Sequence, residues 1–129
     1  MNETLFKIID DRQLVSVMNK TKWRELCGEF EEIHELGVSV RYKMITSDQL
    51  YGFSPVWWDQ LFRETVAVEW IDFAPKKRKR RDQLVSDKET DISDVILGIF
   101  KKHNIPYSLE NDFFRVWGYL NQDVHPVFV

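Results

Sequence analysis

The stretch that decides the fold is residues 66–73, Val-Ala-Val-Glu-Trp-Ile-Asp-Phe. It is rich in β-branched and aromatic residues and ends shortly before Pro75, a combination typical of a strand. Because side chains alternate along a strand, the stretch is expected to have two distinct faces. One face would carry Val66, Val68 and Trp70, and the other Ala67, Glu69, Ile71 and Phe73.

Two further stretches show the same alternation and are also expected to be strands. Residues 38–45 (VSVRYKMI) alternate apolar and polar side chains, and residues 113–120 (FFRVWGYL) do so with larger aromatic residues. The more polar faces of these two strands carry Arg41, Lys43, Arg115, Trp117 and Tyr119.

Helical segments precede and separate these strands. In residues 21–36 apolar side chains recur at steps of three and four, with Thr21 as the expected N-cap and Gly37 at the C-terminal end. A short helix is expected to begin at Ser54-Pro55, and a third long helix to lie within residues 91–104. Residues 1–18 are expected to form an N-terminal helical extension.

The resulting order, α-α-β-α-β-α-β, predicts an α+β fold. We expect a small antiparallel or mixed sheet of three or more strands, with helices packed on its valine-rich face. The other face is a candidate partner-binding surface, because Arg, Trp and Tyr are enriched at binding hot spots. It would carry Arg41, Lys43, Glu69, Ile71, Arg115, Trp117 and Tyr119.

Three alternatives to that surface remain open. The first segment of the chain could cover this sheet face, or a second copy of the protein could do so. Glu69 could also serve only as a cross-strand partner of Arg41 or Arg115.

Composition restricts the class of protein further. The 129 residues fit one domain, and the single cysteine, Cys27, excludes an intrachain disulfide and is expected in the core. No signal-peptide pattern and no long apolar run occurs, which predicts a cytoplasmic protein without a membrane segment.

Charge is distributed unevenly along the chain. The formal net charge is −3, but without the six consecutive cations of residues 76–81 it would be −9. Such an acidic body repels nucleic acid and accelerates encounter with basic proteins. The helix of residues 21–36 contributes Glu25, Glu29 and Glu32, which form a second candidate surface for a basic partner.

The basic run supplies an alternative partner class. It consists of Lys76, Lys77, Arg78, Lys79, Arg80 and Arg81. We expect residues 76–90 to form a mobile loop, basic and then acidic. Six adjacent cations can bind phosphates, but no aromatic residue is interleaved for base stacking. A solvated loop is therefore favoured over a nucleic-acid site or a contact with an acidic protein.

Motifs for catalysis or cofactor binding do not occur. No phosphate-binding glycine loop, nucleophile elbow or zinc-ligand spacing is present, and the three histidines are isolated. We expect no catalytic residue, no metal and no cofactor. An unrecognised enzyme would need a pocket that holds Glu69, Arg115 and a histidine with a perturbed pKa.

Residues 51–58 (YGFSPVWW) are unusually aromatic. They are expected to form a lid over the core, or alternatively a contact patch or small-molecule pocket. One of the two adjacent tryptophans should lie near the surface, because neighbouring helical residues cannot share a face.

Three segments carry a resemblance to a family of uncharacterised small bacterial proteins. They are residues 19–23 (NKTKW), 68–71 (VEWI) and 114–119 (FRVWGY), and the likeness covers about residues 19–119. This family has no assigned activity, so the resemblance implies no catalytic residues. In size, acidity and aromatic content the chain is also similar to immunity proteins of bacterial contact-dependent inhibition and polymorphic toxin systems.

These observations favour a protein that binds another protein and has no catalytic activity. The most specific hypothesis is an immunity protein that occludes the active site of a basic toxin domain. A nucleic-acid-associated protein that uses residues 76–81 is the alternative. The sequence does not define the partner, the oligomeric state or the strand order.

Overall fold

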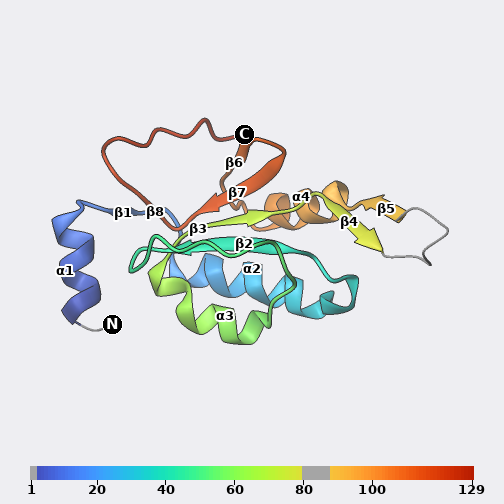
Figure 1. Cartoon of the computed structure of the whole chain (residues 1–129), viewed down its shortest axis with the longest axis horizontal. Helices are drawn as coiled ribbons and strands as arrows, with labels where there is room; N and C mark the ends of the chain where they lie inside the picture. The colour runs from blue at the N-terminus through green and yellow to red at the C-terminus, as the bar shows by residue number, and fades with distance from the viewer. Residues whose placement is uncertain (1–2, 80–87) are drawn as a thin grey trace.

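The computed structural model describes residues 3–79 and 88–129. The architecture is α+β, as predicted (Figure 1). The helices are α1 (Glu3–Asp11), α2 (Lys20–Glu32), α3 (Trp58–Glu64) and α4 (Ser93–Lys102), with single 3₁₀ turns at His34–Leu36 and Thr65–Ala67. The strands are β1 (Val15–Ser16), β2 (Val40–Met44), β3 (Val68–Phe73), β4 (Lys76–Lys79), β5 (Lys88–Asp91), β6 (Tyr107–Glu110), β7 (Phe113–Trp117) and β8 (Tyr119–Leu120).

The central sheet has four strands in the order β2-β3-β7-β6, and every neighbouring pair is antiparallel. The predicted strands β2, β3 and β7 form its centre and one edge. Strand β6 was not predicted, nor were the two-stranded sheets β1-β8 and β4-β5. These additional strands have two to four residues, too few for an alternation pattern to be distinguished from turn sequence.

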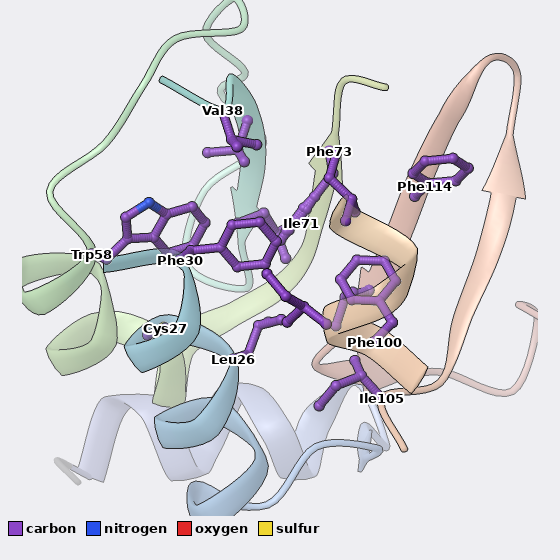
Figure 2. Close-up of a cluster of buried hydrophobic side chains, with 14 of the residues drawn as sticks. Leu26, Cys27, Phe30, Val38, Trp58, Ile71, Phe73, Phe100, Ile105 and Phe114 are labelled. Carbon is purple, nitrogen blue, oxygen red and sulfur yellow. The ribbon is translucent and has the colours of Figure 1, made fainter. Parts of the chain in front are cut away.

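Helices α2, α3 and α4 cover one face of the sheet, which confirms the predicted layering. The largest buried side chains come from both layers: Phe30 of α2 stacks on Phe73 of β3 with ring centroids 4.9 Å apart, and Phe100 of α4 lies against the same ring (Figure 2). Trp58 of α3 stacks on Phe30 at 5.0 Å and also lies 5.9 Å from Phe73, so the three rings form one cluster. Cys27 is buried in this core, as expected from its place on the apolar face of α2.

A β-bulge in β3 reverses the predicted faces of this strand. Lys43 pairs with Trp70, but the next residue of β2, Met44, pairs with Val68, so Glu69 is the extra residue. Beyond the bulge, Ile71 and Phe73 point into the helical core, whereas Trp70 and Asp72 point to the opposite face. The predictions that Ile71 lies on the polar face and Trp70 on the valine face were therefore wrong.

A second, smaller core lies at the end of the sheet near α1. It consists of Leu5, Leu14, Ile45 and Tyr119, with the partly buried Ile8, Ile9 and Ala67 against them. The phenol of Tyr119 donates to the carbonyl of Val66 at 2.6 Å. Tyr119 was predicted on the open sheet face and is instead buried here, because the chain leaves β7 at Gly118 to pair with β1.

Several helix boundaries differ from those predicted. Helix α2 is capped by Asn19, whose side-chain oxygen accepts from the amide of Lys22, and not by Thr21. Helix α3 begins at Trp58 and not at Ser54, since Ser54 is hydrogen-bonded to Val40 at the edge of β2. The N-terminal extension contains one helix, α1, followed by strand β1.

Candidate partner-binding surfaces

A row of charged residues crosses the sheet on the face away from the helices. Cross-strand pairing aligns Arg41 of β2, Asp72 of β3, Arg115 of β7 and Ser108 of β6. Asp72 is fully buried and accepts from both arginines: Arg115 binds it in a bidentate manner at 2.6 and 2.9 Å, and Arg41 at 3.0 Å. Two guanidinium groups therefore share one carboxylate, which leaves the group with an excess of one positive charge.

Aromatic rings enclose this charged row. The guanidinium of Arg115 lies 3.7 Å from the ring centroid of Trp70, and that of Arg41 lies 4.8 Å from Phe53. The indole of Trp117 donates to the hydroxyl of Ser108. Among the described residues, the Nε of Arg41 is buried without an acceptor.

The side chains of the predicted binding face therefore contact one another. Trp70 and Trp117 are buried, and Arg41 and Arg115 are held on Asp72. These residues stabilise the sheet and present little free surface to a partner. The sequence pattern did not predict that Asp72 is the partner of the two arginines. The available signal was the position of an aspartate between Ile71 and Phe73 in an otherwise apolar strand.

Glu69 lies at the bulge and has two cationic partners, neither of them the predicted Arg41 or Arg115. Its carboxylate is 2.8 Å from Arg12 and 3.3 Å from Lys43. Arg12 follows α1, so this ion pair attaches the N-terminal segment to the sheet. Part of the N-terminal segment thus contacts the edge of the polar face at Glu69, whereas the alternative stated above was that this segment covers the face.

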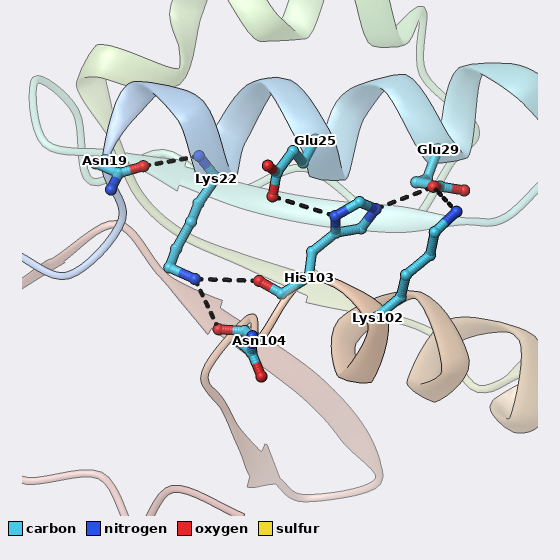
Figure 3. Close-up of polar contacts among 7 residues, drawn as sticks. All are labelled: Asn19, Lys22, Glu25, Glu29, Lys102, His103 and Asn104. Carbon is cyan, nitrogen blue, oxygen red and sulfur yellow. Dashed lines mark hydrogen bonds and ion pairs between the residues drawn. The ribbon is translucent and has the colours of Figure 1, made fainter.

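The acidic face of α2 is joined to the C-terminal end of α4 (Figure 3). Glu29 binds Lys102 at 2.6 Å and His103 at 2.9 Å, while Glu25 binds the other ring nitrogen of His103 at 3.1 Å. The hydrogen bond from Lys102, followed by that from His103, lowers the pKa of Glu29.

The same contact holds the start of α2 in place. The ammonium of Lys22 donates to the carbonyls of His103 and Asn104, which directly follow α4 (Figure 3). Two of the three predicted partner-binding glutamates therefore have an internal role, whereas Glu32 is exposed.

The basic run forms part of a hairpin and not the predicted loop. Strand β4 pairs with β5, so that Lys76 lies opposite Asp91 and Arg78 opposite Glu89. Lys76 also forms an ion pair with Glu89 at 3.4 Å. Of the predicted nucleic-acid residues, Lys76 and Arg78 thus lie opposite acidic residues, whereas Lys77 lies opposite Thr90 and Lys79 opposite Lys88. Arg80 and Arg81 lie outside the described residues.

The segment of residues 46–57, here called the aromatic segment, exposes three large apolar side chains. Tyr51 and Trp57 are each 71% exposed, and Leu50 is 47% exposed. The segment is anchored to the sheet, because the ring of Phe53 packs at a tilt on Phe113 with centroids 4.6 Å apart and Ser54 pairs with Val40. As predicted, one of the two adjacent tryptophans lies at the surface: Trp57 is exposed and Trp58 is buried.

Residues 3–79 and 88–129 contain one thiol and several carboxylates and imidazoles as groups for covalent or metal chemistry. Burial raises the pKa of the Cys27 thiol to about 12, which disfavours the nucleophilic thiolate. Within these ranges no cluster of three or more His, Cys, Asp or Glu side chains could hold a metal ion. None of the helices that the structure describes has the length and apolar character needed to cross a membrane.

These features define a small α+β domain with an antiparallel sheet, a self-filled charged face and an exposed aromatic segment. A family model for a family of unknown function, DUF6678, matches residues 5–123, and the chain belongs to this family. The match includes most of α1, from Leu5 on, which lay outside the range of the predicted resemblance. The chain has no match among curated proteins, and no solved structure matches it.

Proposed function

We propose that this protein acts by binding another protein through the aromatic segment, as an immunity protein that neutralises a bacterial toxin would do. The observation that carries this proposal is the exposure of Tyr51 and Trp57 on an anchored segment. Tyr and Trp dominate binding hot spots, and an anchored segment loses little conformational entropy when a partner docks.

The charge of the molecule supports a basic partner. Asp48 lies within the segment and Asp59 just after it, and both are exposed; the net charge outside residues 76–81 is −9. An acidic surface increases the rate at which a basic toxin domain is encountered. Occlusion of the toxin requires no catalytic group on this chain.

The test is co-expression of this chain with each toxic product of the neighbouring genes, followed by titration calorimetry of the purified pair. Trp57→Ser should weaken binding by roughly 30-fold or more, the size of a hot-spot loss of about 2 kcal/mol. Tyr51→Ser should act in the same direction.

Val95→Ser is the matched control. Val95 has an exposed apolar side chain on α4, outside the aromatic segment, and its replacement should leave the affinity within about twofold. The proposal is overturned if no neighbouring product is both toxic and relieved by this chain. The role of the aromatic segment is overturned if Trp57→Ser and Val95→Ser bind the toxin partner with the same affinity.

A further inference from the structure

A large cavity lies at the end of the molecule where α1, the start of α2, the end of α3 and β8 meet. Its volume is about 870 Å³, within the range of small-molecule sites in proteins. Most of its lining is apolar and comes from both cores: Ile9, Leu14, Met18, Trp23, Phe62 and Tyr119. The aromatic segment contributes no residue to it, so the cavity is separate from the proposed partner surface.

Most polar groups of the lining are already bonded within the chain. The hydroxyl of Tyr119 donates to Val66, the hydroxyl of Ser16 donates to Met18 at 2.8 Å, and the side chain of Asn19 caps α2. These groups have little capacity left for a ligand. The bound molecule is therefore expected to be apolar over most of its surface.

Two cations in the lining are the exception. Lys20 and Arg63 are exposed, and neither forms an ion pair with any residue in the ranges the structure describes. By contrast, Arg12, Lys43 and Arg115 each bind a carboxylate. In an acidic protein, two cations without a carboxylate partner beside an apolar cavity provide charge complementarity for an anion.

We propose that this cavity binds an amphipathic anion with an alkyl body and a carboxylate head, the chemistry of a fatty acid. The alkyl chain lies on the apolar lining, and the carboxylate lies beside Lys20 and Arg63. This site is an addition to the proposed function and does not depend on it.

The first experiment tests the charge preference with two probes of equal chain length, dodecanoate and dodecanol. Each is titrated calorimetrically into the full chain below its micelle or solubility limit. One dodecanoate should bind per chain, roughly tenfold more tightly than dodecanol, because two partly exposed ion pairs contribute up to about that factor.

Replacement of the cations should remove this preference selectively. Lys20→Ser/Arg63→Ser should bring the dodecanoate affinity close to that of dodecanol and leave dodecanol binding unchanged. The control Lys77→Ser/Lys101→Ser makes the same change in net charge outside the cavity and should retain the preference. Equal binding of the two probes to the unmodified protein, or an equal loss in both double variants, overturns the proposal.

The second experiment tests the location. Val66 lines the cavity and is 40% exposed, so Val66→Trp should fill the site and abolish dodecanoate binding. Val95, 41% exposed on α4, gives the matched control Val95→Trp, which should bind normally.

The unmodified protein supplies a readout that does not depend on a variant that folds. In a nitrogen-15 NMR titration, the indole N–H of Trp23 in the cavity should shift with dodecanoate, and that of Trp57 should not. Absence of dodecanoate binding, an unshifted Trp23 indole, or normal binding by folded Val66→Trp each overturns the proposal.

Discussion

Asp72 joins three strands through its single carboxylate, which accepts hydrogen bonds from an arginine on each side. A buried carboxylate is costly to desolvate, and here two guanidinium groups compensate that cost. The arginines depend on the carboxylate in turn, because Arg115 is packed against Trp70 and Arg41 against Phe53.

Asp72→Asn is therefore expected to lower the free energy of unfolding by roughly 2–4 kcal/mol, since it leaves two partly buried cations without a counter-charge. Urea unfolding of the variant and the parent measures the difference. The control Asp123→Asn, at an exposed position after β8, should change stability by less than about 0.5 kcal/mol. A loss below about 1 kcal/mol in Asp72→Asn would show that Asp72 is not the anchor of this face.

The sequence predicted which residues lie on this face better than it predicted whether they are free to bind a partner. Arg41, Arg115 and Trp117 do share the face away from the helices, as the alternation implied. Whether such residues are free or bound within the chain depends on Asp72 and on the bulge at Glu69. Hydrophobic periodicity predicts neither the role of Asp72 nor the bulge.

At the scale of elements, the contact between α2 and α4 is mainly electrostatic at its outer rim. Glu29 receives hydrogen bonds from Lys102 and His103, and the first of these is the larger cause of its lowered pKa. Because the folded pKa lies below the unfolded value, the contribution of Glu29 to stability is fully present above about pH 4.3. It is lost as the pH falls through the folded pKa.

Glu29→Gln is expected to remove the pH-dependent contribution of Glu29 to the free energy of unfolding. The variant should therefore lose less stability than the parent between neutral pH and about pH 3. Denaturant unfolding at both pH values gives the comparison. Glu31→Gln, at an exposed position of the same helix, serves as the control and should follow the parent. Identical pH profiles for Glu29→Gln and the parent would contradict a stabilising role for this contact.

The junction of β7 and β8 depends on a glycine. A Cβ added to Gly118 would lie 2.1 Å from the carbonyl oxygen of Val68, and the amide of Gly118 donates to Glu69. Any larger residue has to separate β7 from the bulge in β3, because the obstructing atom belongs to the backbone.

Gly118→Ala is expected to destabilise the fold by about 1–3 kcal/mol, as overpacking does elsewhere. Gly98 offers an opposite control, since a methyl group added at its position in α4 would meet nothing within 4 Å and Ala is the better helix former. Thermal unfolding should therefore shift down for Gly118→Ala and up for Gly98→Ala. A neutral Gly118→Ala would show that the junction is able to move.

At the scale of the whole molecule, the layering followed from long periodic stretches and was predictable. The stripes of α2 and α4 and the alternation of β2 and β7 were each long enough to give one orientation. The small sheets β1-β8 and β4-β5 depend on pairing between short segments. They therefore form through tertiary contacts and cannot be predicted from the local sequence.

Charge at this scale distinguishes the two partner classes. Replacement of all six cations at 76–81 by serine changes the formal net charge from −3 to −9. For a basic protein partner, the association rate at low salt should rise, by roughly twofold to tenfold. Stopped-flow mixing at two salt concentrations measures this rate, and the gain should vanish at high salt.

The nucleic-acid alternative predicts the opposite result. Binding of single-stranded RNA or duplex DNA would weaken steeply with salt and be lost in the serine variant. Salt-dependent nucleic-acid binding by the parent, together with an unchanged association rate for a basic protein, would favour that alternative.

The hydrogen bonds at the two outer strands of the central sheet have a consequence for recognition. The edge of β2 is bonded at Val40 to Ser54, and the edge of β6 is bonded at Tyr107 and Ser108 to the C-terminal segment at Val129 and Phe128. An incoming strand that tried to extend the sheet would have to displace these bonds on either side. Addition of a strand is thereby disfavoured at Val40 of β2 and at Tyr107 and Ser108 of β6.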